Sequence, residues 1–190
     1  MAELSTVQGD QALREVLTSK NGIHIALLNL LLAAGANPNL SVLRGQAVLL
    51  DAISTKDAGS VETLLKADAT TNLPFNSGVY YSPVQLTAKE SSLEVLQMLL
   101  AHGCNPNFVA PCLQILPDNL PPGAEILYDE PIGSVIQCAT ERCDFEKVTL
   151  LLAHNADPNA VTKICPHTAL QIASRDGSKS IAELLLMVQT

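Results

Sequence analysis

Aromatic residues are scarce in this chain, which limits the kind of core it can build. Its 190 residues include no Trp, three Tyr and three Phe, so aromatic residues make up 3% of the sequence. Hydrophobic residues of all kinds nevertheless make up 47%. The core is therefore expected to consist of Leu, Ala, Val and Ile, a composition typical of stacked helices.

Positive charge and long apolar runs are also lacking. Eleven Lys and Arg face 19 Asp and Glu, giving a net charge of −8, so no nucleic-acid partner is expected. The longest nearly uncharged apolar run, residues 25–36, is shorter than the roughly 18 residues of a membrane span, so no membrane partner is expected.

The first ten residues lack a basic segment before an apolar block, which predicts no secretory signal. We expect an intracellular protein, cytoplasmic or nuclear.

No constellation for catalysis, metal binding or cofactor binding is present in the sequence. The five Cys form no C-x-x-C pair, so the sequence predicts reduced thiols without a zinc or redox site. No Gly-rich phosphate loop occurs either. Cys138 is expected to be a buried inert thiol, and Cys143, in a turn, has no visible base. His102 and His154 occupy equivalent places before a helix end, which favours a shared structural role over a metal site. We predict no catalytic residue, no metal and no cofactor.

The most informative stretch is residues 82–107, SPVQLTAKESSLEVLQMLLAHGCNPN. Ser82 and Pro83 provide a capping hydroxyl and a first-turn proline, which together predict a helix start. A second helix with apolar residues at helical spacing follows Ser92. Gly103 ends that helix at a position where a left-handed residue is favoured.

The same pattern returns along the chain. Closing asparagines at Asn39, Asn72, Asn107 and Asn159 are separated by 33, 35 and 52 residues. Helix pairs are expected before each of them, and once more at the C-terminus. The predicted helices cover residues 8–20, 24–34, 45–52, 61–67, 83–90, 93–101, 134–140, 145–154, 168–173 and 181–188.

These motifs resemble the ankyrin repeat, whose pattern runs T-P-L-H-x-A, a glycine, an aliphatic helix and a closing G-A-D-x-N, with a period of about 33 residues. The resemblance implies an all-α solenoid of helix–turn–helix units with β-hairpin fingers. It covers one domain, 1–190, in five repeats at about 8–39, 40–72, 73–107, 108–159 and 160–190. The insertion at about 108–133 is interpreted as a lengthened hairpin, and an irregular surface loop is the alternative.

One departure from the family pattern has a structural consequence. The family histidine is replaced by Leu50, Gln85, Gln137 and Gln171. In the family that histidine bonds neighbouring turns, so the three glutamines are expected to do the same.

Binding residues are expected in the connections. Five of the six aromatics lie there, and the stretch from Glu90 to Glu141 holds no Lys or Arg. An acidic, aromatic finger of this kind indicates a docking site for a protein partner of basic or mixed charge, whereas packing at the base of the loop and simple solubility are the alternatives. The finger residues are Phe75, Tyr80, Tyr81, Phe108, Asp118, Glu125, Tyr128, Asp129 and Glu130. The resemblance adds groove residues at the outward ends of the first helices, namely Lys89, Glu90, Glu141, Arg142, Arg175 and Asp176.

The resemblance implies a non-enzymatic protein–protein interaction module with a concave groove. The alternative is a scaffold or regulatory segment of a longer, even enzymatic, protein, and a free-standing enzyme is a third hypothesis. The final helix, residues 181–188, lacks the polar outer face of a terminal repeat. It is therefore expected to continue into further chain, or else to be covered by a partner or a second copy. The sequence leaves the oligomeric state open.

Two non-glycine residues stand where the family pattern has its stopping glycine. We predict that Asp68→Gly and Asn155→Gly each raise the free energy of unfolding by up to about 1 kcal/mol, because glycine tolerates a left-handed conformation best. Urea denaturation measures the change. A loss of stability in both variants would show that neither position is left-handed.

Overall fold

The computed structural model describes residues 6–17, 25–39, 48–72, 82–90, 92–108, 133–163 and 165–188. These residues form ten helices and no strand, so the all-α prediction is confirmed for them. The helices are α1 (Thr6–Leu17), α2 (Ile25–Ala33), α3 (Val48–Ser54), α4 (Ala58–Lys66), α5 (Pro83–Glu90), α6 (Leu93–Ala101), α7 (Val135–Glu141), α8 (Phe145–Ala153), α9 (Ala169–Arg175) and α10 (Lys179–Val188).

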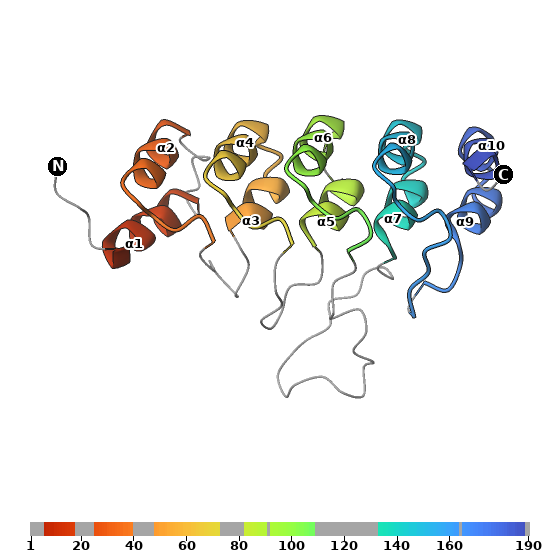
Figure 1. The fold of residues 1–190 in the computed structure, drawn as a ribbon, viewed down its shortest axis with the longest axis horizontal. Coiled ribbons are helices and arrows are strands. Elements are labelled where there is room, and N and C mark those ends of the chain that lie inside the picture. The colour runs from red at the N-terminus through yellow and green to blue at the C-terminus, as the bar shows by residue number, and fades with distance from the viewer. Residues whose placement is uncertain are drawn as a thin grey trace.

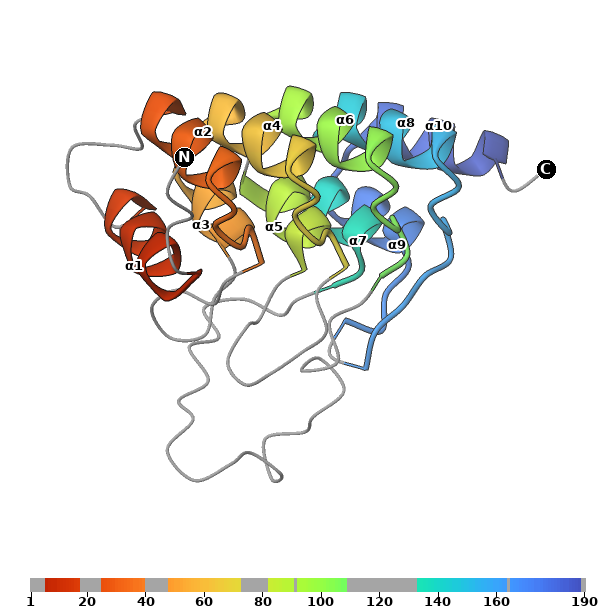
Figure 2. The same ribbon diagram turned by 60° about the vertical axis from the view of Figure 1, so that its left-hand side comes forward.

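The ten helices lie in two parallel rows (Figure 1). The odd-numbered helices form one row and the even-numbered helices the other, and the turned view of Figure 2 shows the same order. Each odd helix contacts the even helix that follows it, and each pair contacts the next pair through both rows. The first and last pairs therefore lie at opposite ends of the row (Figure 1).

Every predicted helix is present, with differences at the boundaries. The helix predicted at residues 61–67 begins three residues earlier, at Ala58, because the Asp57 carboxylate accepts a bond of 3.2 Å from the Ser60 amide and caps the helix. Gly59, a weak helix former, obscured this start in the sequence. Residues 109–132 lie outside the described residues, so the lengthened hairpin stays a prediction.

The core is aliphatic, as the composition predicts. Buried Leu, Val, Ile and Ala side chains from all ten helices form one continuous cluster. Phe145 is 44% exposed and Phe108 is half-buried, so neither described aromatic belongs to the core. Small helices can pack closely against one another through such aliphatic faces.

The turns after the helices have the predicted backbone conformation. Asp68 and Asn155 have φ of 60° and 63°, beside Gly35 and Gly103 at 90° and 77°. The left-handed assignment of both non-glycine residues is confirmed.

Buried glutamines join consecutive helix pairs. The Gln85 side chain accepts a 3.0 Å bond from the Ser82 amide and donates one of 2.9 Å to the Gly133 carbonyl of the next pair. Gln137 repeats this arrangement, donating to the carbonyl of His167. The expectation that glutamine links neighbouring turns is confirmed for Gln85 and Gln137, whereas Gln171 is exposed and its side chain bonds only its own helix cap.

The closing asparagines form a second set of links between pairs. In the first three of them the side-chain oxygen accepts a bond from a backbone amide in the exit turn of the following pair. These bonds join Asn39 to Thr70 at 2.6 Å, Asn72 to Asn105 at 3.2 Å, and Asn107 to Asp157 at 2.7 Å. Consecutive exit turns are thereby fixed in one alignment.

We predict that Gln137→Ala lowers the free energy of unfolding by about 2–4 kcal/mol, because it leaves buried backbone groups without partners and opens a cavity. Gln171→Ala is the matched control. Gln171 is exposed and its oxygen accepts only from its own helix cap, Thr168, so the expected loss is about 1 kcal/mol or less. Urea denaturation compares the two. Equal losses would mean that the link between pairs contributes nothing.

Candidate functional site

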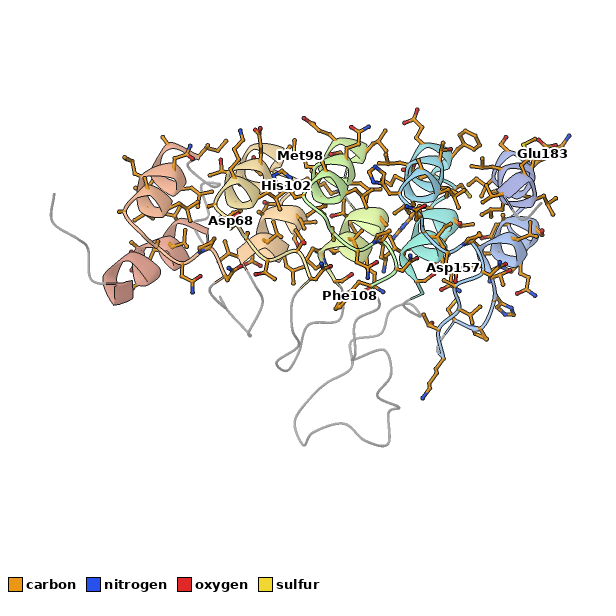
Figure 3. All side chains as sticks on the ribbon, viewed as in Figure 1. Asp68, Met98, His102, Phe108, Asp157 and Glu183 are labelled. Carbon is orange, nitrogen blue, oxygen red and sulfur yellow. The ribbon has the colours of Figure 1, made fainter. Side chains whose placement is uncertain are left out.

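Most residues of the predicted finger lie outside the described part of the chain. They are Phe75, Tyr80, Tyr81, Asp118, Glu125, Tyr128, Asp129 and Glu130. Of the predicted finger residues the structure describes Phe108, which lies beside the row of odd-numbered helices, on the side away from the even-numbered row (Figure 3). Its amide donates a 3.1 Å bond to the Asn105 carbonyl, which fixes the turn that carries it.

The structure describes all six predicted groove residues, and it brings them into one row. Ser82, Ser134 and Thr168 each stand directly before the first helix of a pair. Counting from them, the seventh residue is Lys89, Glu141 or Arg175, and the eighth is Glu90, Arg142 or Asp176. Because α5, α7 and α9 lie side by side, these six residues fall at equivalent places on neighbouring helices. We call them the charged row.

Charges alternate in sign along the charged row. The seventh position is positive, negative and positive in successive pairs, and the eighth is negative, positive and negative. Neighbouring charges of opposite sign attract rather than repel. The six formal charges therefore sum to zero, although the whole chain has a net charge of −8.

The pKa values of Arg175 and Asp176 in the charged row are shifted by neighbouring charges. Arg175 Nε lies 2.8 Å from Asp176 Oδ1, and this contact raises the pKa of Arg175, with a smaller contribution from Glu141 in the preceding pair. The same contact lowers the pKa of Asp176. Both groups are therefore charged at neutral pH.

A buried lysine fixes the helix end that begins the charged row. Lys147 on α8 is 6% exposed, and its ammonium lies 3.0 Å from Asp144 Oδ2. It also donates a 3.4 Å bond to the Ala88 carbonyl in the last turn of α5. That carbonyl is one of the helix-end acceptors that have no partner within the helix. Lys147 thus holds the turn that carries Lys89 and Glu90.

Cys138 and Cys143 have the environments that the sequence predicts, the first buried and the second exposed. Burial raises the pKa of Cys104 to about 11 and of Cys138 to about 12, so neither provides a thiolate at neutral pH. Cys143 is exposed in a turn, and its sulfur accepts a 3.0 Å bond from the Ser178 hydroxyl. Cys112 lies outside the described residues.

The two equivalent histidines lie at helix ends, as predicted. His102 follows α6 and His154 follows α8 at the C-cap position. The His102 Nδ1 atom lies 2.9 Å from the Met98 carbonyl oxygen, which is a local helix-end contact (Figure 3). Within the described ranges no three His, Cys, Asp or Glu side chains form a group that could hold a metal ion.

Comparison with protein-family models and with curated protein sequences gives no match. Among the helices that the structure describes, none has the length and hydropathy needed to cross a membrane.

Sequence reasoning found the members of the charged row but missed its alternation. The acidic residues between Glu90 and Glu141 suggested an acidic surface. Four of them, Asp118, Glu125, Asp129 and Glu130, belong to the finger and lie outside the described residues. Aligning the chain on the capping residues Ser82, Ser134 and Thr168 brings out the alternating signs. That alignment was the signal in the sequence.

We predict that Asp144→Ala lowers the free energy of unfolding by about 3–5 kcal/mol, because it removes the cap of α8 and leaves the buried Lys147 ammonium without its carboxylate. Lys147→Met, which fills similar volume without a charge, should stay within about 1 kcal/mol of wild type. The double variant should lose only the cap, about 1 kcal/mol. Urea denaturation of the three variants and the wild type gives a double-mutant cycle. Losses of unfolding free energy that simply add in the double variant would contradict a coupled Asp144–Lys147 pair.

Proposed function

We propose that the chain is an ankyrin-repeat solenoid of five helix pairs that acts as a non-enzymatic protein-binding module. The observation that carries the proposal is the charged row, six residues of alternating sign at equivalent places on three neighbouring helices. The helix caps and the hydrogen bonds between helix pairs support it. A row that is fixed before binding loses little conformational entropy when a partner docks.

The alternation refines the kind of partner. A uniformly acidic surface favours a basic partner, whereas a row that sums to zero favours a partner that presents charges of both signs in matching order. Such matching contributes mainly to specificity, since an inverted order places like charges opposite each other. The acidic and aromatic finger residues, defined above, are the second part of the proposed surface.

An inverted row tests this proposal without changing the net charge. The variant exchanges every sign in the row, with Lys89→Glu, Glu90→Lys, Glu141→Lys, Arg142→Glu, Arg175→Glu and Asp176→Lys. Neighbouring charges remain opposite, so the stack should fold as before. The matched control exchanges the pairs Glu62/Lys66 and Lys179/Glu183, which are exposed ion pairs on α4 and α10 in the other row of helices.

We expect affinity capture from cell lysate, with quantitative mass spectrometry, to recover a protein on the wild type and on the control that the inverted row holds at least about tenfold less. A third bait, with Asp118, Glu125, Asp129 and Glu130 changed to Lys, tests the finger. Equal capture by the inverted row and loss by this third bait would move the site to the finger. Capture that no variant alters, or no captured protein at all, would overturn the proposal.

A further inference from the structure

The second helices of all five pairs share one burial pattern. Aligned on the exit turns and on the turns between helices, α2, α4, α6, α8 and α10 begin at equivalent residues, Ile25, Ala58, Leu93, Phe145 and Lys179. The seventh residue is buried in all five helices. The third and eighth residues differ between the ends of the stack and its interior, and this difference identifies the neighbour that each position faces.

The third position faces the preceding pair. Lys147, third in α8, reaches the Ala88 carbonyl of the pair before it. In the interior and last pairs the third residue is buried, with Ser60 and Val95 both at 0% and Ile181 at 2%. In α2, which belongs to the first pair that the structure describes, the third residue is Leu27 and is 43% exposed. Leu30, on the same side at the sixth position, is 67% exposed.

The eighth position faces the following pair. Leu65 and Leu100 occupy it in α4 and α6 and are 3% and 6% exposed, and Leu32 in α2 and Leu152 in α8 are half-buried against the core. In α10 the same position is Leu186, which is 52% exposed. Both ends of this chain therefore carry leucines at positions that elsewhere pack between pairs.

The side chain of Gln171, in the last pair, also lacks the contact that its equivalents make with a following pair. Gln85 and Gln137 are fully buried, and each side-chain amide donates to the backbone just before the next first helix. Gln171 holds the equivalent position in α9, accepts the same cap bond from Thr168, and is exposed. Its amide group is positioned to donate to a further pair of the same kind.

We propose that two copies of this chain associate head to tail, with α10 of one copy against α2 of the next and α9 against α1, as even and odd helices pack within the stack. Leu186 of the first copy would pack on Leu27 and Leu30 of the second, repeating the contact that joins successive pairs within the chain. The proposal concerns a surface separate from the charged row and does not depend on the proposed partner. Because the two contacting surfaces differ, the contact is heterologous and leaves a free head and a free tail on every assembly.

Charge and size set the expected strength. Two chains of net charge −8 repel each other, so association should increase with ionic strength as salt screens that repulsion. The end of one helix pair is at the small end of the interface size range, so association should appear between about 10 µM and 1 mM.

Two single variants and their mixture test the geometry. Leu30→Glu blocks the head and leaves the tail intact, whereas Leu186→Glu blocks the tail and leaves the head intact. Both residues are exposed, so both variants should keep the wild-type circular dichroism and melting temperature. Sedimentation velocity should show growing assemblies for the wild type and, for each variant alone, monomer with association weakened at least about tenfold. Their equimolar mixture should form a heterodimer that does not grow further.

Phe145→Glu is the control, because Phe145 is 44% exposed but belongs to an interior pair. It should associate as the wild type does. A wild type that stays monomeric across the range at high salt would overturn the proposal. Self-association that survives in either variant alone, with no heterodimer in the mixture, would overturn it in favour of a symmetric end-to-end contact.

Discussion

The structure depends on contact between neighbouring helix pairs. Its helices have seven to twelve residues, and isolated helices shorter than about 12–15 residues are marginal in water. No pair can therefore rely on its own helices, and each must cover the pair beside it. This requirement explains why the second helices repeat one burial pattern, with buried residues on the sides that face the preceding and the following pair.

Hydrogen bonds between pairs add specificity to this apolar contact. Leu on Leu would tolerate sliding, but a fully buried glutamine amide has partners only when the next pair lies at one position. The bonds of Gln85 and Gln137 set that position near the start of the first helices. The closing asparagines set it at the exit turns, where Asn107 bonds Asp157. Leu50, in the second pair, has no amide to make this link, so its pair relies on the asparagine bonds and on apolar contact.

The same stacking creates the surface that we propose for binding. Residues 52 and 34 positions apart in sequence, such as Lys89, Glu141 and Arg175, become neighbours because their helices share one alignment. A buried ion pair then fixes the first of these helix ends through Lys147. The buried thiols of Cys104 and Cys138, whose pKa values are raised by burial, are not thiolates at neutral pH.

The sequence by itself determined the helices, their turns and the roles of the buried glutamines, because these depend on capping residues, helical spacing and tolerance of positive φ, all local properties. It missed the start of α4, where the Asp57 cap outweighs Gly59. It did not show the alternation of the charged row, and it identified an unpaired last helix without the matching exposure of Leu27 and Leu30. Only the tertiary structure decided these features, because the side of a helix that meets a neighbour is set by how the pairs stack, and distant residues acquire a common surface only then.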